Sequence, residues 1–104
     1  MNSIYLYRTN IYNIIVKIEL TPTLDLCIEG TARREYLKSA DQYMQRGQKD
    51  RKLEEKIELL RMFLETMDFR KLRAESEKYL VDGKVVKFIL TSEKGKPKYE
   101  MKVD

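Results

Sequence analysis

The sequence of 104 residues has no histidine, no tryptophan and a single cysteine, Cys27. Without histidine the chain has no Ser-His-Asp triad, no Cys-His pair and no imidazole ligand for a metal ion. One cysteine also excludes an intramolecular disulfide and a cysteine-rich zinc site. We therefore expect a non-enzymatic protein that uses no cofactor and no metal ion.

Long apolar runs and clustered glycines are lacking too. Every apolar run is far shorter than the ~20 residues that cross a membrane, and the start lacks the basic segment and apolar run of a signal peptide. We therefore expect no membrane contact and a cytoplasmic location. The four glycines are spread along the chain and form no phosphate-binding loop; each stands at an expected element boundary.

Charged residues are abundant, at 37% of the chain, and the formal net charge is +4. With 42% hydrophobic residues, this composition is typical of a folded domain with a densely charged surface, a feature also found in heat-adapted proteins. The length fits one domain, residues 1–104. It divides into a strand zone of charge −1 (1–30), a helical zone of +2 (31–83) and a hairpin zone of +3 (84–104).

Residues 1–30 are rich in β-branched and aromatic side chains, which favour strands. Apolar and polar residues alternate over residues 12–20 and over residues 24–28, which predicts two strands with one apolar face each. Residues 21–23, with a central proline, predict the turn that pairs them. An earlier turn at residues 9–10 adds a third strand, and one long bent strand is the alternative.

Residues 31–83 are rich in arginine, lysine, glutamate and leucine, which favour helices. We expect Thr31 to cap the first helix and Gly47 to follow its end. Asp50 then caps a second helix, and the short link makes an antiparallel helical pair. The apolar stripe through which the first helix is expected to pack into the core consists of Tyr36, Leu37, Ala40, Tyr43 and Met44.

The apolar pattern of the second helix changes direction near Asp68. The stripe before that point is Leu53, Ile57, Leu60, Leu64 and Met67. The set that begins at Phe69 lies about 120° farther around the helix axis, so one straight helix does not bury both stripes in one core. Either the helix bends, or it breaks and Asp68 caps a third helix; we favour the break.

Residues 84–104 alternate strictly and predict a β-hairpin. A two-residue turn at Lys94-Gly95 pairs apolar residues with one another: Leu90 with Tyr99, Phe88 with Met101, and Val86 with Val103. The predicted fold class is α+β. An antiparallel sheet, built from an N-terminal two- or three-stranded meander and a C-terminal β-hairpin, flanks a middle segment of two or three helices.

Apolar residues also fall on the sheet face turned away from the helices. They are Ile4, Leu6, Ile11, Ile15, Val85 and Ile89. An antiparallel sheet with one face in water alternates more strictly, and an exposed apolar patch marks a contact site. We therefore predict a homodimer formed through the N-terminal strands, since two-fold dimers are the commonest assembly; contact with another protein is the alternative. Chain-end effects or a register error are the alternative explanation.

Eight basic residues are candidate phosphate contacts. They are Arg46, Lys49, Arg51 and Lys52 at the tip of the helical pair, and Lys94, Lys96, Lys98 and Lys102 in the hairpin. Clusters of this kind attract nucleic-acid backbones, so nucleic-acid binding is the alternative function. The sequence has no recognition-helix motif and no aromatic RNA-binding signature, and a solvated surface is the ordinary interpretation.

Two further features suggest chemistry only weakly. Asp50, Glu54 and Glu58 share one helix face, but the i,i+4 charge pairs around them are typical of an exposed helix. Cys27 is expected on the outer face of its strand beside Lys17, as a packed thiol. The sequence assigns no catalytic, cofactor-binding or metal-ligating residue.

Overall fold

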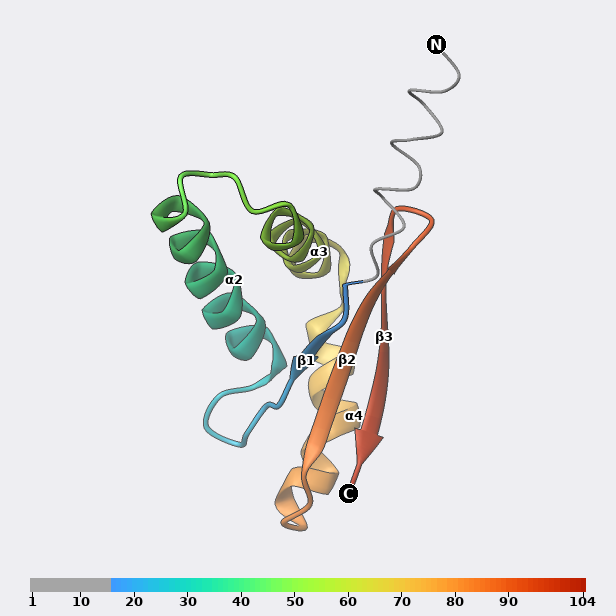
Figure 1. Ribbon diagram of the computed structural model, residues 1–104. Coiled ribbons are helices and arrows are strands. Elements are labelled where there is room, and N and C mark those ends of the chain that lie inside the picture. Colours follow the sequence, from blue (N-terminus) through green and yellow to red (C-terminus); the bar gives the residue numbers. More distant parts are fainter. Residues whose placement is uncertain (1–15) are drawn as a thin grey trace.

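The computed structural model describes residues 16–104, in which three helices lie against one face of a three-stranded antiparallel sheet (Figure 1). The elements are β1 (Ile18–Leu20), α2 (Ile28–Gln45), α3 (Arg51–Thr66), α4 (Phe69–Val81), β2 (Val86–Glu93) and β3 (Lys96–Val103). The α+β class is confirmed, with three helices in the middle segment. The predicted turn at residues 9–10 lies outside the described residues.

The hairpin of β2 and β3 has the predicted register. Its inward pairs are Val86 with Val103, Phe88 with Met101, and Leu90 with Tyr99. Lys94 and Gly95 have φ values of 53° and 75°, the left-handed pair that a two-residue type I′ turn requires. The turn therefore sets which residues pair, and the alternation sets which face they share.

The N-terminal strand has a different partner from the one predicted. β1 pairs with β2, with Ile18 opposite Leu90 and Leu20 opposite Phe88, so β2 is central and β1 is an edge. The prediction that residues 24–28 form a strand paired with residues 12–20 is wrong. Residues 24–26 form a bend, and α2 already begins at Ile28.

A local turn replaces that predicted strand. The Leu26 amide donates to the Thr23 hydroxyl at 2.9 Å, and the Thr23 amide donates to the Leu26 carbonyl at 2.9 Å. Short-range bonds of this kind compete with a strand ladder. They reverse the chain so that Ile28 enters the core at the start of α2, where it is 1% exposed.

Helix α2 begins earlier than predicted, and its buried face only partly overlaps the predicted stripe, from which Tyr36 packs against the core. Its N-cap is Cys27, not Thr31, whose hydroxyl donates to the Cys27 carbonyl at 2.9 Å from inside the helix. The buried side chains of the helix are Ile28, at its first position, and the small residues Ala32 and Ser39. As a result Leu37 and Met44, which were expected in the core, are 65% and 61% exposed.

The two aspartates expected to start helices do so. Asp50 accepts a hydrogen bond from the Leu53 amide at 3.0 Å, and Asp68 accepts one from the Lys71 amide at 3.3 Å. The predicted break between α3 and α4 is therefore confirmed. Across it the rings of Phe63 and Phe69 pack edge to face, with centroids 5.4 Å apart, so the second apolar stripe joins the same core from a new direction.

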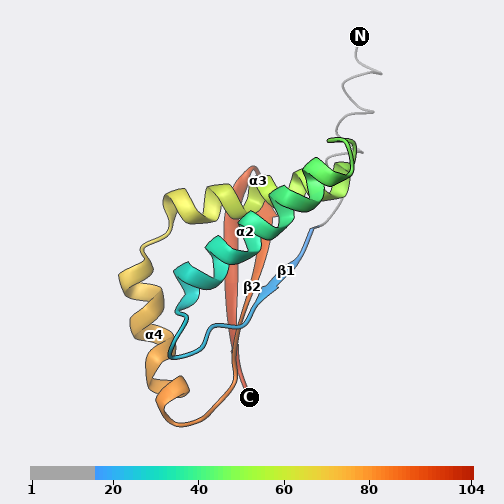
Figure 2. The ribbon, with the colours of Figure 1, turned by 90° about the vertical axis from the view of Figure 1, so that its left-hand side faces the viewer.

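The core lies between the helices and one face of the sheet (Figure 2). The sheet contributes Ile18, Leu20, Val86, Phe88 and Leu90, each at most 4% exposed. The helices contribute Ile28, Ala32, Leu59, Leu60, Phe63 and Leu72. Within residues 16–104, no helix covers the opposite face of the sheet.

Candidate functional site

The side chains that alternate with the core residues form the uncovered side of the sheet, which we call the open face. It consists of Lys17 and Glu19 from β1 and its approach, Lys87, Ile89 and Thr91 from β2, and Lys98, Glu100 and Lys102 from β3. Several of these line a shallow depression of about 320 Å³. Four lysines against two glutamates make the open face basic.

The structure places only part of the predicted apolar interface. Ile4, Leu6, Ile11 and Ile15 lie outside the described residues. Val85 is 45% exposed beside the chain end, where its amide and carbonyl bond with Asp104. Ile89 lies half-buried at the centre of the open face.

These two described apolar residues do not touch one another along β2. Lys87 stands between Val85 and Ile89, and the neighbours of Ile89 across the sheet are Glu19 and Glu100. The described part of the predicted interface is therefore a charged surface with an apolar centre, rather than a continuous apolar patch.

The basic tip of the helical pair carries acidic partners. Arg46 pairs with Asp50, and Arg51 lines an open depression of about 410 Å³ together with Glu54, Glu55 and Glu58. Lys49 and Lys52 are exposed. The Leu53 amide, followed by Arg46, lowers the pKa of Asp50, so the tip keeps a negative charge among its cations.

The hairpin lysines are split between the open face and the turn. Lys98 pairs with Glu93 at 2.7 Å, and Lys102 lies opposite Lys87. Lys94 occupies the turn and Lys96 the first position of β3. The two basic groups of the sequence thus belong to different layers, the helices and the sheet (Figure 1).

Sequence reasoning missed the grouping of Lys17 with the hairpin lysines. Lys17 shares the depression of the open face with Lys98 and Lys102. Alternation alone indicated that Lys17 points away from the core. Which residues lie beside Lys17 is set by the pairing of β1 with β2. These strands are far apart in the sequence, so no turn motif predicts that pairing.

Tyr99 faces the core and is held at its edge, as the register predicts. Its ring lies 5.7 Å from that of Phe88, and its hydroxyl donates to Glu75 on α4 at 3.1 Å. Burial, followed by the hydrogen bond to Glu75, raises the pKa of Tyr99. The ring of Tyr99 is therefore held toward Phe88 and Glu75, although the residue also borders the depression of the open face.

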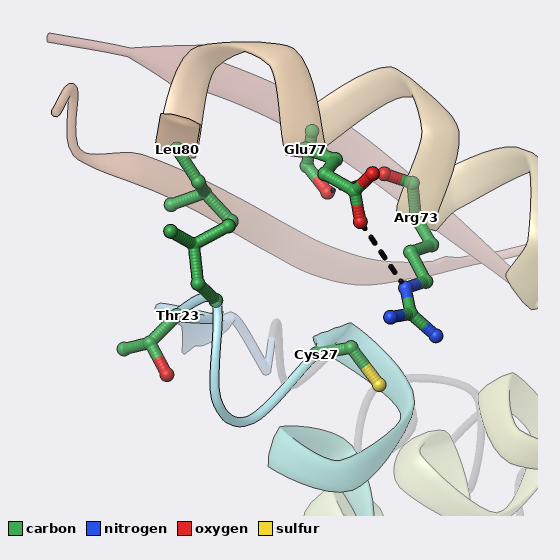
Figure 3. Close-up of a pocket in the computed structure, with 7 residues that line it drawn as sticks. Thr23, Cys27, Arg73, Glu77 and Leu80 are labelled. Carbon is green, nitrogen blue, oxygen red and sulfur yellow. Dashed lines mark hydrogen bonds and ion pairs between the residues drawn. The ribbon is translucent and has the colours of Figure 1, made fainter. Parts of the chain in front are cut away.

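Cys27 lies at the start of α2 and not on a strand beside Lys17, so that prediction is wrong. It borders a narrow cavity of about 10 Å³ between the loop before α2 and helix α4 (Figure 3). Arg73 and Glu77, on the α4 side, form an ion pair at 3.4 Å. The space is that of one water molecule, so this cavity is too small for an organic ligand.

Within the described chain, no helix is both long and apolar enough to cross a membrane. The same residues contain no cluster of three or more histidine, cysteine, aspartate or glutamate side chains arranged to hold a metal ion.

Comparison with known proteins identifies the family but gives no function. No curated protein and no solved structure matches the chain significantly. One family profile matches residues 14–103, which include every described helix and strand. The chain therefore belongs to this uncharacterised family of small α+β domains.

Proposed function

We propose that the protein is a non-enzymatic binding domain that forms a homodimer through the open face of its sheet. The observation that carries the proposal is the position of Ile89, a half-buried apolar residue at the centre of a face that no described helix covers. An apolar centre with a charged rim is the usual anatomy of a protein interface.

The open face also includes the described part of the interface that the sequence predicts. Four of the predicted residues precede β1, and the fifth and sixth, Val85 and Ile89, belong to the same side of the sheet. β1, which follows these four residues in the sequence, is an edge of the sheet. We therefore keep the homodimer as the leading function and place its centre at Ile89.

Sedimentation equilibrium tests this proposal with a matched pair of variants. Ile89→Glu places a charge at the centre of the open face, and we expect it to keep the protein monomeric where the wild type dimerises. Leu37→Glu, on exposed α2, makes the same chemical change elsewhere and should leave the dimer intact. A wild type that stays monomeric at every concentration refutes the homodimer.

Nucleic-acid binding is the second candidate, favoured by the four lysines of the open face. Backbone contacts by lysine are independent of sequence, and the inward position of Tyr99 removes the stacking that reads single-stranded bases. The expected ligand is therefore the phosphate backbone, recognised through charge alone.

A salt titration with duplex and single-stranded nucleic acid tests this candidate. Each phosphate that the protein neutralises makes the slope of log K (the binding constant) against log salt concentration more negative by about 0.9 on duplex DNA. We expect Lys17→Gln with Lys98→Gln to make the slope less steep by about two such steps. Lys71→Gln, on exposed α4, is the control, and binding without salt dependence contradicts the candidate.

A further inference from the structure

Charges on the open face are sorted into rows that run across the strands. Ile18 pairs with Leu90, so Lys17 lies beside Thr91, which pairs with Lys98. We call these three residues the lysine row. The adjacent row, which we call the glutamate row, is Glu19, Ile89 and Glu100. Like charges share a row, and opposite charges occupy neighbouring rows.

The described chain leaves most of these charges without partners. Within residues 16–104, no ion pair or side-chain hydrogen bond involves Lys17, Glu19 or Glu100. Lys98 does pair with Glu93, but both side chains remain more than half exposed. The like charges of each row stand on β1 and β3, separated by a residue of β2, so they form no cross-strand pair with one another. The rows therefore stabilise little within one copy and are available to a surface with the complementary pattern.

A second copy of the open face has that pattern in one arrangement. Two identical faces meet about a two-fold axis that lies in their common plane. An axis along the strands sets each row against itself and opposes Glu19 to Glu100. An axis across the strands through the glutamate row opposes each glutamate to its own copy. Both arrangements are repulsive.

The axis across the strands can also lie on either side of the glutamate row, and these two positions give different charge pairs. Midway between the two rows, the axis sets Lys17 against Glu19 of the other copy and Lys98 against Glu100 of the other copy, each pair occurring twice. Shifted to the other side of the glutamate row, the axis sets Glu100 against Lys102 and Lys98 against Asp104, but it leaves Lys17 and Glu19 without a charged partner and sets Ile89 against Lys87. The first position gives every charge of both rows an opposite partner and brings Ile89 onto Thr91.

We infer that two copies pack open face to open face about this axis, between Ile89 and Thr91, so that the lysine row of each copy contacts the glutamate row of the other. The inference rests on the proposed homodimer and specifies its register. Facing sheets lie about 10 Å apart, a gap that lysine and glutamate side chains reach across. Because the pairs are solvent-accessible at the rim, association weakens as salt is added.

Charge-swap variants of the full chain test the register. One variant carries Glu19→Lys and Glu100→Lys, and the other carries Lys17→Glu and Lys98→Glu. Each alone has two rows of one sign, so we expect its dimer to dissociate at least ten-fold more readily than the wild type. An equimolar mixture restores every pair, and analytical ultracentrifugation with native mass spectrometry should find the heterodimer.

The controls separate failure of the register from failure of the homodimer. Lys52→Glu with Lys71→Glu changes the net charge as the second variant does, at exposed first-turn positions of α3 and α4, and should leave the dimer intact. Circular dichroism checks that every variant is folded. A mixture that stays monomeric while the wild type dimerises overturns the register alone. A wild type that never dimerises overturns both proposals.

Discussion

At the scale of single residues, Asp50 and Asp68 divide the helical segment. Each accepts a backbone amide three residues ahead and so satisfies a donor that the first turn of a helix leaves free. Asp50 is further surrounded by the amide of Leu53 and the side chain of Arg46, which lower its pKa. A capping aspartate is a local signal, so both helix starts could be predicted from the sequence.

The lowered pKa of Asp50 predicts acid sensitivity. In the folded protein the pKa of the Asp50 carboxyl lies below its ordinary value of 3.8. Above pH 3.8 the carboxylate is therefore charged, and its stabilising contribution is complete. The contribution is lost as the pH falls through the folded pKa. Asn also caps helices but carries no charge. We expect Asp50→Asn to lower the thermal midpoint near neutral pH and to match the wild type increasingly as the pH falls toward about 2.

Thermal unfolding followed by circular dichroism across this pH range measures the effect. Asp41→Asn, at an exposed position within α2, is the control for loss of one carboxylate. A midpoint difference between wild type and Asp50→Asn that stays constant down to the lowest pH contradicts the prediction.

At the scale of elements, the β2–β3 hairpin and helix α2 behave differently. The hairpin has a two-residue turn and strict alternation, and both act between residues close in the chain. The buried face of α2 depends on where the helix begins, which the turn between Thr23 and Leu26 decides. Leu37 and Met44 fitted the predicted helical stripe, but both face outward, whereas Tyr36 of the same stripe packs against the core.

The hairpin turn predicts a stabilising substitution. Lys94 has a φ of 53°, a conformation that costs lysine more than asparagine. We expect Lys94→Asn, which creates the favoured Asn-Gly turn, to raise the free energy of unfolding by about 0.5 kcal/mol.

Urea denaturation measures this change in the free energy of unfolding. Gly95→Ala should act in the opposite direction by about 1 kcal/mol, because the φ of Gly95 is 75°. If both substitutions change the stability in the same direction, the assigned turn conformation is wrong.

At the scale of the whole molecule, the sheet is packed on one side. Phe88 is fully buried against the helices, while Ile89, its neighbour in β2, lies on the open face. The two residues therefore differ in what their removal does. Loss of the ring leaves a cavity in the core, whereas loss of the isoleucine side chain changes a surface that is already in contact with solvent.

This asymmetry predicts opposite outcomes for two alanine substitutions. We expect Phe88→Ala to lower the free energy of unfolding by about 3–5 kcal/mol. Ile89→Ala should cost much less stability when measured on the monomer at low concentration, yet weaken self-association. Denaturation and sedimentation of both variants provide the measurements. Comparable losses of monomer stability would show that the open face is covered.

The sequence alone predicted the hairpin register, the two aspartate caps and the α+β class, and it favoured the break at Asp68 over a bend, because alternation, a tight turn and a capping residue are local signals. Only the tertiary structure decided that β1 pairs with β2, that α2 turns Leu37 outward, and that Lys17 joins Lys98 on one face. These outcomes depend on contacts between distant parts of the chain, where burial of Ile18, Leu20 and Ile28 in one shared core selects among local patterns that fit equally well.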